Sequence, residues 1–207
     1  MSPLETLGFA LGTSFASGLN VYATVAAAGL FQRMGWVDLP ASLDILSHPL
    51  VMGIAATMFV VEFIADKIPL VDSAWDAVHT FIRPPAAMLL AYSSFGGVPE
   101  AWKLGAALVA GSVALTSHGA KASARAAANT SPEPVSNWLL SFGEDAVAIS
   151  LSWLAATHPV LTGVIVVVLV MIATFVIWKL FGFFRRALGK VREGYRRAVA
   201  AVEPGTG

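Results

Sequence analysis

The sequence predicts an all-α polytopic membrane protein with about six membrane segments, some of them short or broken. The 207-residue chain is 57% hydrophobic and 13% charged, and its mean hydropathy of +0.73 lies outside the range of soluble domains. Apolar runs occur at residues 7–30, 50–64, 85–95, 104–115, 139–156 and 160–184. Since one span takes about 20 residues, we expect a single transmembrane domain over residues 1–184.

The six runs differ in length, and this difference predicts two kinds of segment. The first and last, 7–30 and 160–184, are long enough to cross the bilayer alone. The start of the chain lacks the basic residues of a signal peptide, so we expect the first run to be a span and not a cleaved leader. The run at 85–95, and the part of the run at 139–156 that follows Glu144 and Asp145, are short and come after polar stretches, which predicts broken or partly inserted helices there.

Two stretches of the chain resemble each other and predict a duplicated helical hairpin over residues 46–97 and 104–157. Lys67 in "ADKIP" aligns with Lys121 in "GAKAS", and Arg83 aligns with Glu144. A rival alignment pairs "SGLNVYA" with "HGAKASA" and divides the chain into two three-helix halves. The first scheme predicts repeats of the same topology, whereas the second predicts inverted repeats.

Basic residues predict the orientation. The tail at 185–207, which begins "RRALGKVREGYRR", carries six of the thirteen Lys and Arg residues, and Lys and Arg accumulate on the cytoplasmic side of membrane proteins. With six spans, both termini are expected in the cytoplasm of a bacterium, with the protein in its inner membrane.

Charged side chains predict two facing surfaces near that side. His118, Lys121 and Arg125 are three and four residues apart and share one face of a helix, while Glu62 and Asp66 share a face of another. A charge at bilayer depth costs about 2.5–3.5 kcal/mol, which implies mutual pairing or a water-filled cavity.

We expect these groups to line a polar cavity on the cytoplasmic half. The candidate solute-binding residues are Glu62, Asp66, Asp76, His118, Lys121, Arg125, Asn129 and Asn137. In this hypothesis the basic groups hold negative charge on the solute, and the carboxylates balance them. Arg83 with Glu144 or Asp145 is expected to form a gate or latch. The competing interpretation is a purely structural network that locks the hairpins together.

Three stretches resemble a known family: "ASGLNVYAT", "FIADKIPLVDSAWDAVHTFIRPPA" and "HGAKASARAAANTSPEPVSNW" followed by "SFGED". They are similar to the bacterial integral-membrane proteins grouped as domain of unknown function 4126. The resemblance implies a membrane protein and assigns no activity to any residue.

The predicted function is a transporter or channel for a small ionic or zwitterionic solute. The chain has no cysteine, which excludes thiolate metal sites, and no phosphate-binding loop or serine elbow, so we expect no enzyme activity and no cofactor. We predict no metal site and no nucleic-acid partner, although carboxylates and free carbonyls leave a site for a hard cation such as Mg²⁺ or Ca²⁺ open. Membrane lipids and further copies of the chain are the other expected partners. Two alternatives stay open: a protein that handles lipid headgroups, and a scaffold that transports nothing.

Overall fold

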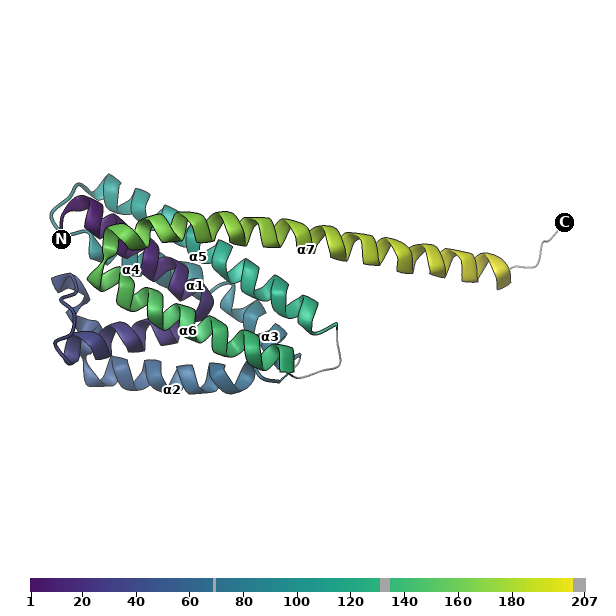
Figure 1. Ribbon diagram of the computed structural model, residues 1–207, viewed down its shortest axis with the longest axis horizontal. Helices are drawn as coiled ribbons and strands as arrows, with labels where there is room; N and C mark the ends of the chain where they lie inside the picture. Colours follow the sequence, from purple (N-terminus) through teal and green to yellow (C-terminus); the bar gives the residue numbers. More distant parts are fainter. Residues whose placement is uncertain (69, 131–134, 203–207) are drawn as a thin grey trace.

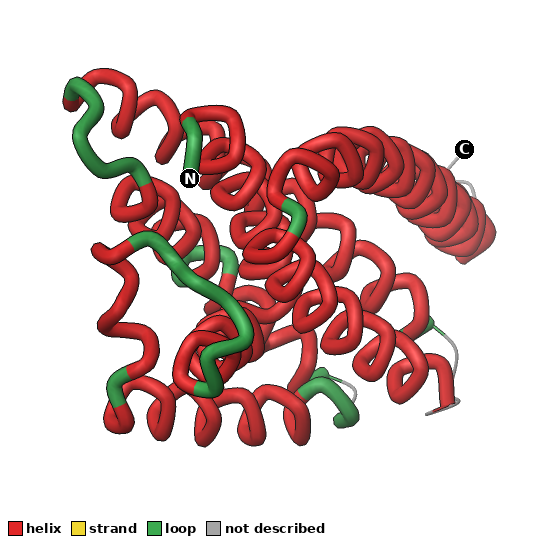
Figure 2. The backbone as a smooth tube through the Cα atoms, turned by 60° about the vertical axis from the view of Figure 1, so that its left-hand side comes forward, coloured by secondary structure: helices red, strands yellow, loops and turns green. Residues whose placement is uncertain are grey.

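The computed structural model describes residues 1–68, 70–130 and 135–202, and all its regular elements are helices (Figure 1). They are α1 (Pro3–Arg33), the 3₁₀ helix η1 (Ala41–Ser47), α2 (Pro49–Ala65), α3 (Val71–His79), α4 (Arg83–Ser94), α5 (Glu100–Ala128), α6 (Val135–Thr157) and α7 (Pro159–Val202). Figure 2 shows these helices joined by short loops, with α7 leaving the bundle along one side. The prediction of an all-α protein is confirmed for the described residues.

Helix α1 is folded back on itself at Asn20, whose backbone is extended (φ −154°, ψ 102°). The side-chain oxygen of Asn20 accepts a hydrogen bond from the Ala23 amide at 2.9 Å, which is the geometry of an N-cap. A new helix therefore begins at this residue, and residues 3–19 and 21–33 form two half-helices.

The two half-helices lie side by side, because Phe9 of the first packs in one apolar cluster with Ala28 of the second. The first half starts beside Pro159, since a Cβ on Gly8 would stand 2.0 Å from the Pro159 carbonyl oxygen. The second half returns to the same level, where the Phe31 ring lies 5.0 Å from that of Trp153. Both ends of α1 are thus at one end of the bundle, which we call the amino-terminal end, and the tip at Asn20 is inside it.

Helices α2, α5 and α6 run between the amino-terminal end and the opposite end, where α2 and α5 end and α6 begins; we call this opposite end the elbow end (Figure 1). The α6–α7 turn lies at the amino-terminal end, and α7 then extends past the elbow end (Figure 1). The start of α1 and the C-terminal half of α7 are consequently at opposite ends. The prediction that both termini are cytoplasmic is not confirmed by this arrangement, because α1 turns back on itself.

Three helices are long and apolar enough to cross a membrane: α1, α6 and Pro159–Arg186 of α7. The pair η1 and α2, bent by 63°, passes the same test together. A chain with membrane-spanning helices is therefore confirmed, whereas six segments and an internal repeat are not.

The predicted broken helices are half right. The short run at 85–95 is confirmed as the 12-residue α4, which follows α3 after a break at residues 80–82. The run at 139–156 belongs instead to the continuous 23-residue α6. This helix continues through its polar residues because Asn137, Ser141 and Asp145, four residues apart, all lie on its buried face.

Candidate functional site

A buried cluster of charged side chains lies where the tip of α1 meets α2, α3, α4, α5 and α6. We call it the charge cluster, and its members are Glu62, Asp66, Asp72, Asp76, Arg83, Lys121, Arg125, Glu144 and Asp145. Eight of these residues are buried, and the Glu144 side chain is 10% exposed. Charges at this depth are stable only when they are paired.

Arg83 connects four helices to α4. It is the first residue of α4, and its guanidinium donates to Glu62 of α2 at 2.7 Å and to the Gly18 carbonyl of α1 at 3.2 Å. The same group lies 3.4 Å from Asp76 of α3 and donates to Nδ1 of His118 on α5 at 2.6 Å. The planar fork of an arginine suits such divergent acceptors.

Lys121 and Arg125, one turn apart on α5, face the acidic residues of α2. The Lys121 ammonium lies 3.2 Å from Glu62 and 3.0 Å from Asp66, and Arg125 lies 2.8 Å from Asp66. Arg125 also holds Glu144 of α6 at 2.5 Å. The prediction that the acidic face of 62 and 66 meets the basic face of 121 and 125 is confirmed.

His118 is part of this network as a neutral ring. Its Nδ1 must accept, because the Arg83 guanidinium can only donate. Its proton is therefore on Nε2, which donates to the Thr80 hydroxyl at 2.9 Å or to the Asp76 carbonyl at 3.1 Å. In this arrangement the ring is neutral and acts as an acceptor for Arg83.

At the break in α1, backbone carbonyl groups accept hydrogen bonds from the same cations. The last carbonyls of the first half-helix have no partner within the helix, and that end carries the negative pole of the helix dipole. Gly18 accepts from Arg83 at 3.2 Å, and Leu19 accepts from Lys121 at 3.1 Å. The break is thus held in place by the charge cluster.

The start of the second half-helix meets α6. Asn20 donates to Asp145 at 2.8 Å, an interhelical hydrogen bond from a polar residue of the first apolar run. Two residues later, the Tyr22 hydroxyl donates to Nε2 of His79 on α3 at 3.1 Å. The break in α1 and the break after α3 therefore lie side by side.

Asn129 and Asn137 extend the network at the elbow end. Asn129 donates to both carboxylate oxygens of Asp72, at 3.1 and 2.9 Å, and Asn137 donates to Asn129 at 2.6 Å. All eleven predicted site and latch residues thus belong to one connected region.

The expected latch has different partners. Among the described residues, no ion pair joins Arg83 to Glu144 or Asp145. Arg83 lies at the start of α4 and pairs with Glu62, whereas Glu144 pairs with Arg125 one helix away. The sequence alignment makes Arg83 and Glu144 equivalent, but equivalent positions of a repeat need not touch, and these two side chains have different partners.

Lys67 lies at the edge of the cluster, just after α2. Its ammonium is 2.9 Å from the centre of the Phe63 ring and donates to the Ser141 hydroxyl at 3.3 Å. Partial burial lowers the pKa of Lys67, while Asp145 and Asp66 act in the opposite direction.

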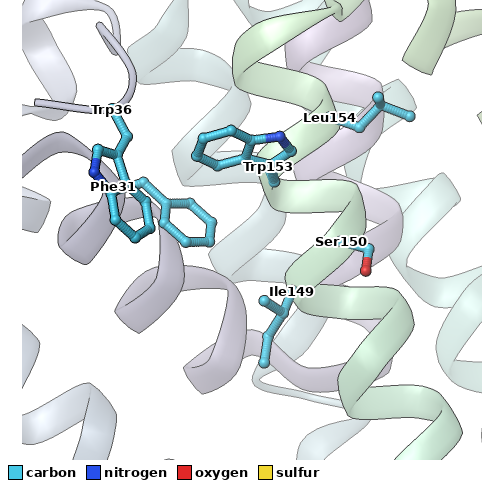
Figure 3. A pocket seen from close by; sticks show the side chains of 6 residues that line it. All are labelled: Phe31, Trp36, Ile149, Ser150, Trp153 and Leu154. Atoms are coloured by element: carbon cyan, nitrogen blue, oxygen red, sulfur yellow. The ribbon is translucent and has the colours of Figure 1, made fainter. Parts of the chain in front are cut away.

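A surface hollow of about 560 Å³ lies at the amino-terminal end, away from the cluster (Figure 3). Its lining is largely apolar and aromatic, with Trp36 and Trp153 on two sides and no charged residue. A lipid headgroup would find no counter-charge there, so the lipid-handling alternative gains no support from this hollow.

The candidate site residues chosen from the sequence did not include Gly18, Tyr22 or His79, which contact the charge cluster or the helix breaks beside it. The signal for the first was present in "SGLN", where a small residue two positions before an amide permits close approach and an N-cap. The surrounding apolar run is long enough for one continuous span, so the sequence did not indicate a helix break at this place.

Comparison with curated proteins and with solved structures gives no match. Within the described residues, no group of three histidine or carboxylate side chains is arranged to hold a metal ion. Residues 7–179 match the family described as Domain of unknown function (DUF4126), and the chain belongs to that family.

Proposed function

We propose that this protein moves a small ionic or zwitterionic solute across the membrane, and that the charge cluster is the path or the binding site. The observation that carries the proposal is the meeting of two helix breaks, at Asn20 and after His79, inside a buried cluster of charges. Interrupted helices that expose backbone groups beside charged residues are the usual construction of transporter sites. Bundles built only for stability have no need of them.

The balance of charge favours a solute with a positive group. Three buried cations face six carboxylates in the charge cluster. Lys121 and Arg125, predicted to hold negative charge on the solute, are each paired with carboxylates of the chain. An anion would have to displace these partners, whereas a cationic group would reduce the excess of negative charge.

The orientation follows from the basic segment of α7. Arg185, Arg186 and Arg192 lie beyond the apolar part of this helix, at the elbow end. By the positive-inside rule, the elbow end faces the cytoplasm and the amino-terminal end faces outward. The inner membrane of a bacterium, contact with lipids and assembly into homo-oligomers remain part of this proposal.

A second candidate, a scaffold that transports nothing, is favoured by one observation. Every cation of the charge cluster has a carboxylate partner within 3.2 Å, as a structural lock requires. In that case the exchange of a whole ion pair for apolar residues is tolerated, since a buried pair adds little stability of its own.

Solute flux in proteoliposomes separates the two candidates. We expect the pair of substitutions Lys121→Met and Asp66→Asn, which removes one charge of each sign, to lower flux of a cationic or zwitterionic solute ~10-fold or more, equivalent to about 1.4 kcal/mol in the barrier. The panel contains protons, Na⁺, K⁺, amino acids and small anions.

The matched control is Lys103→Met with Glu100→Gln, which removes a pair 3.8 Å apart at the amino-terminal end, where Glu100 is exposed and Lys103 is partly exposed. This variant should keep the flux of the unmodified protein. If the buried and the exposed double variants transport equally, or if no solute moves at all, the transport proposal fails and the scaffold is preferred.

A further inference from the structure

One carboxyl group of the charge cluster has no cation of its own. Asp145 of α6 is buried, and its nearest polar partner is the Asn20 side chain, which donates to Oδ1 at 2.8 Å. Its second oxygen, Oδ2, is buried and has no hydrogen-bond partner among the described residues. No lysine or arginine in the described part of the chain is within 4.0 Å of it.

The other carboxylates of the cluster differ from Asp145 in this respect. Glu62, Asp66 and Glu144 each accept a hydrogen bond from Arg83, Lys121 or Arg125. Asp72 accepts from Asn129 and Ser73. Both oxygens of Asp76 also have no hydrogen-bond partner among the described residues, but Asp76 lies 3.4 Å from Arg83 and 4.0 Å from Lys121. Asp145 is thus the member whose negative charge is least compensated.

The surroundings of Asp145 contain charges of both signs at longer range. From α5 and from the segment after α2, Lys121 and Lys67 attract its negative charge, while Glu62 and Asp66 of α2 repel it. On α1, Asn20 and the positive pole of the half-helix that begins there add a partial compensation. These contributions oppose one another, and the unpartnered oxygen remains.

We propose that Asp145, together with Asn20 at the tip of α1, is a proton-binding site that couples proton movement to the position of the α1 hairpin. A proton needs one free carboxylate oxygen, and Oδ2 supplies it. A metal ion would need several oxygen ligands, and the described residues offer no such group. The site rests on the proposed transport function and deepens it, because in the described part of the chain the hydrogen bond of the Asp145 side chain comes from Asn20, the residue at which α1 turns.

Protonation of Asp145 transfers one proton to the carboxylate and breaks or forms no other covalent bond in the protein. The carboxylate accepts a proton at Oδ2 and becomes a neutral carboxylic acid, which is stable in a buried place. On release, the negative charge returns beside Asn20, where water or a cation must reach it. Movement of the hairpin tip would open that access.

Infrared spectroscopy of the full-length protein in detergent tests the site without any transport assay. We expect the carbonyl stretching band of a protonated carboxylic acid at neutral pH, and we expect Asp145→Asn to remove it. The matched control is Asp72→Asn, which removes a buried carboxylate that already has several donors. This control should retain the band.

A second variant guards against failure of Asp145→Asn to fold. Asn20→Ala keeps Asp145 but removes its one donor, so the frequency of the band should shift with the lost hydrogen bond. A band that is absent, or unchanged in both variants, overturns the proton site. If the band behaves as expected but the protein shows no solute flux, the proton site stands. The transport function, on which the coupling rests, is then rejected.

Discussion

Replacement of Arg83 by methionine is expected to lower the free energy of unfolding by ~3–5 kcal/mol, the cost of leaving a buried ion pair half removed. Glu62 would lose its shortest partner, at 2.7 Å, and Asp76 would lose the cation 3.4 Å away. The carbonyl of Gly18 and Nδ1 of His118 would lose a donor at the same time. Unfolding in mixed detergent micelles, followed by circular dichroism, measures the change.

The double variant Arg83→Met with Glu62→Met is expected to be more stable than Arg83→Met alone, because no unpaired Glu62 charge is left. The matched control is Arg33→Met, whose guanidinium is exposed and makes one long contact, 3.5 Å, to the Ser47 carbonyl. This control should stay within ~0.5 kcal/mol of the unmodified protein. Equal stability of Arg83→Met and Arg33→Met would contradict the role given to Arg83.

The second large effect is expected from Gly18→Ala, where α1 crosses α5. A Cβ at this position would stand 1.9 Å from the Ser117 hydroxyl and 2.3 Å from the Ala114 carbonyl oxygen. The hydroxyl can rotate away, but the carbonyl belongs to the backbone of α5, so the two helices must separate. We expect a loss of at least ~1–3 kcal/mol, the usual cost of overpacking, measured by the same unfolding experiment.

Gly105→Ala on α5 is the matched control, because a Cβ there would meet nothing within 4 Å. Alanine is a better helix former than glycine by ~1 kcal/mol, so this variant should be neutral or slightly stabilised. The two substitutions are chemically identical, but only Gly18→Ala is expected to lower the free energy of unfolding. A destabilisation of the same size at both positions would contradict the close contact of α1 with α5.

The charge cluster could be predicted from sequence because its members follow helical spacing. Glu62 with Asp66, and Lys121 with Arg125, are each one turn apart, and charges in an apolar chain must be paired. These two facts are local to each helix, and they were sufficient to predict that the two faces meet.

The path of the chain could not be predicted in the same way. An apolar run of about 20 residues is compatible with one crossing or with two half-length passes, and length alone does not separate them. The turn at Asn20 depends on partners that are distant in sequence, namely Asp145, Arg83 and Lys121. For the same reason, the continuity of α6 through Asp145 became visible only when its buried face was known.

Helix α1 enters and leaves the bundle at one end, with its tip in the charge cluster. The chain has no cysteine, so single cysteines can be introduced at Ser2, Ala41 and Arg192 and labelled in intact cells with a membrane-impermeant maleimide. We predict that Ser2→Cys and Ala41→Cys react from the same side of the membrane, and that Arg192→Cys reacts only after the membrane is opened. Labelling of Ser2→Cys and Ala41→Cys from opposite sides would show that α1 crosses the bilayer and would contradict the account.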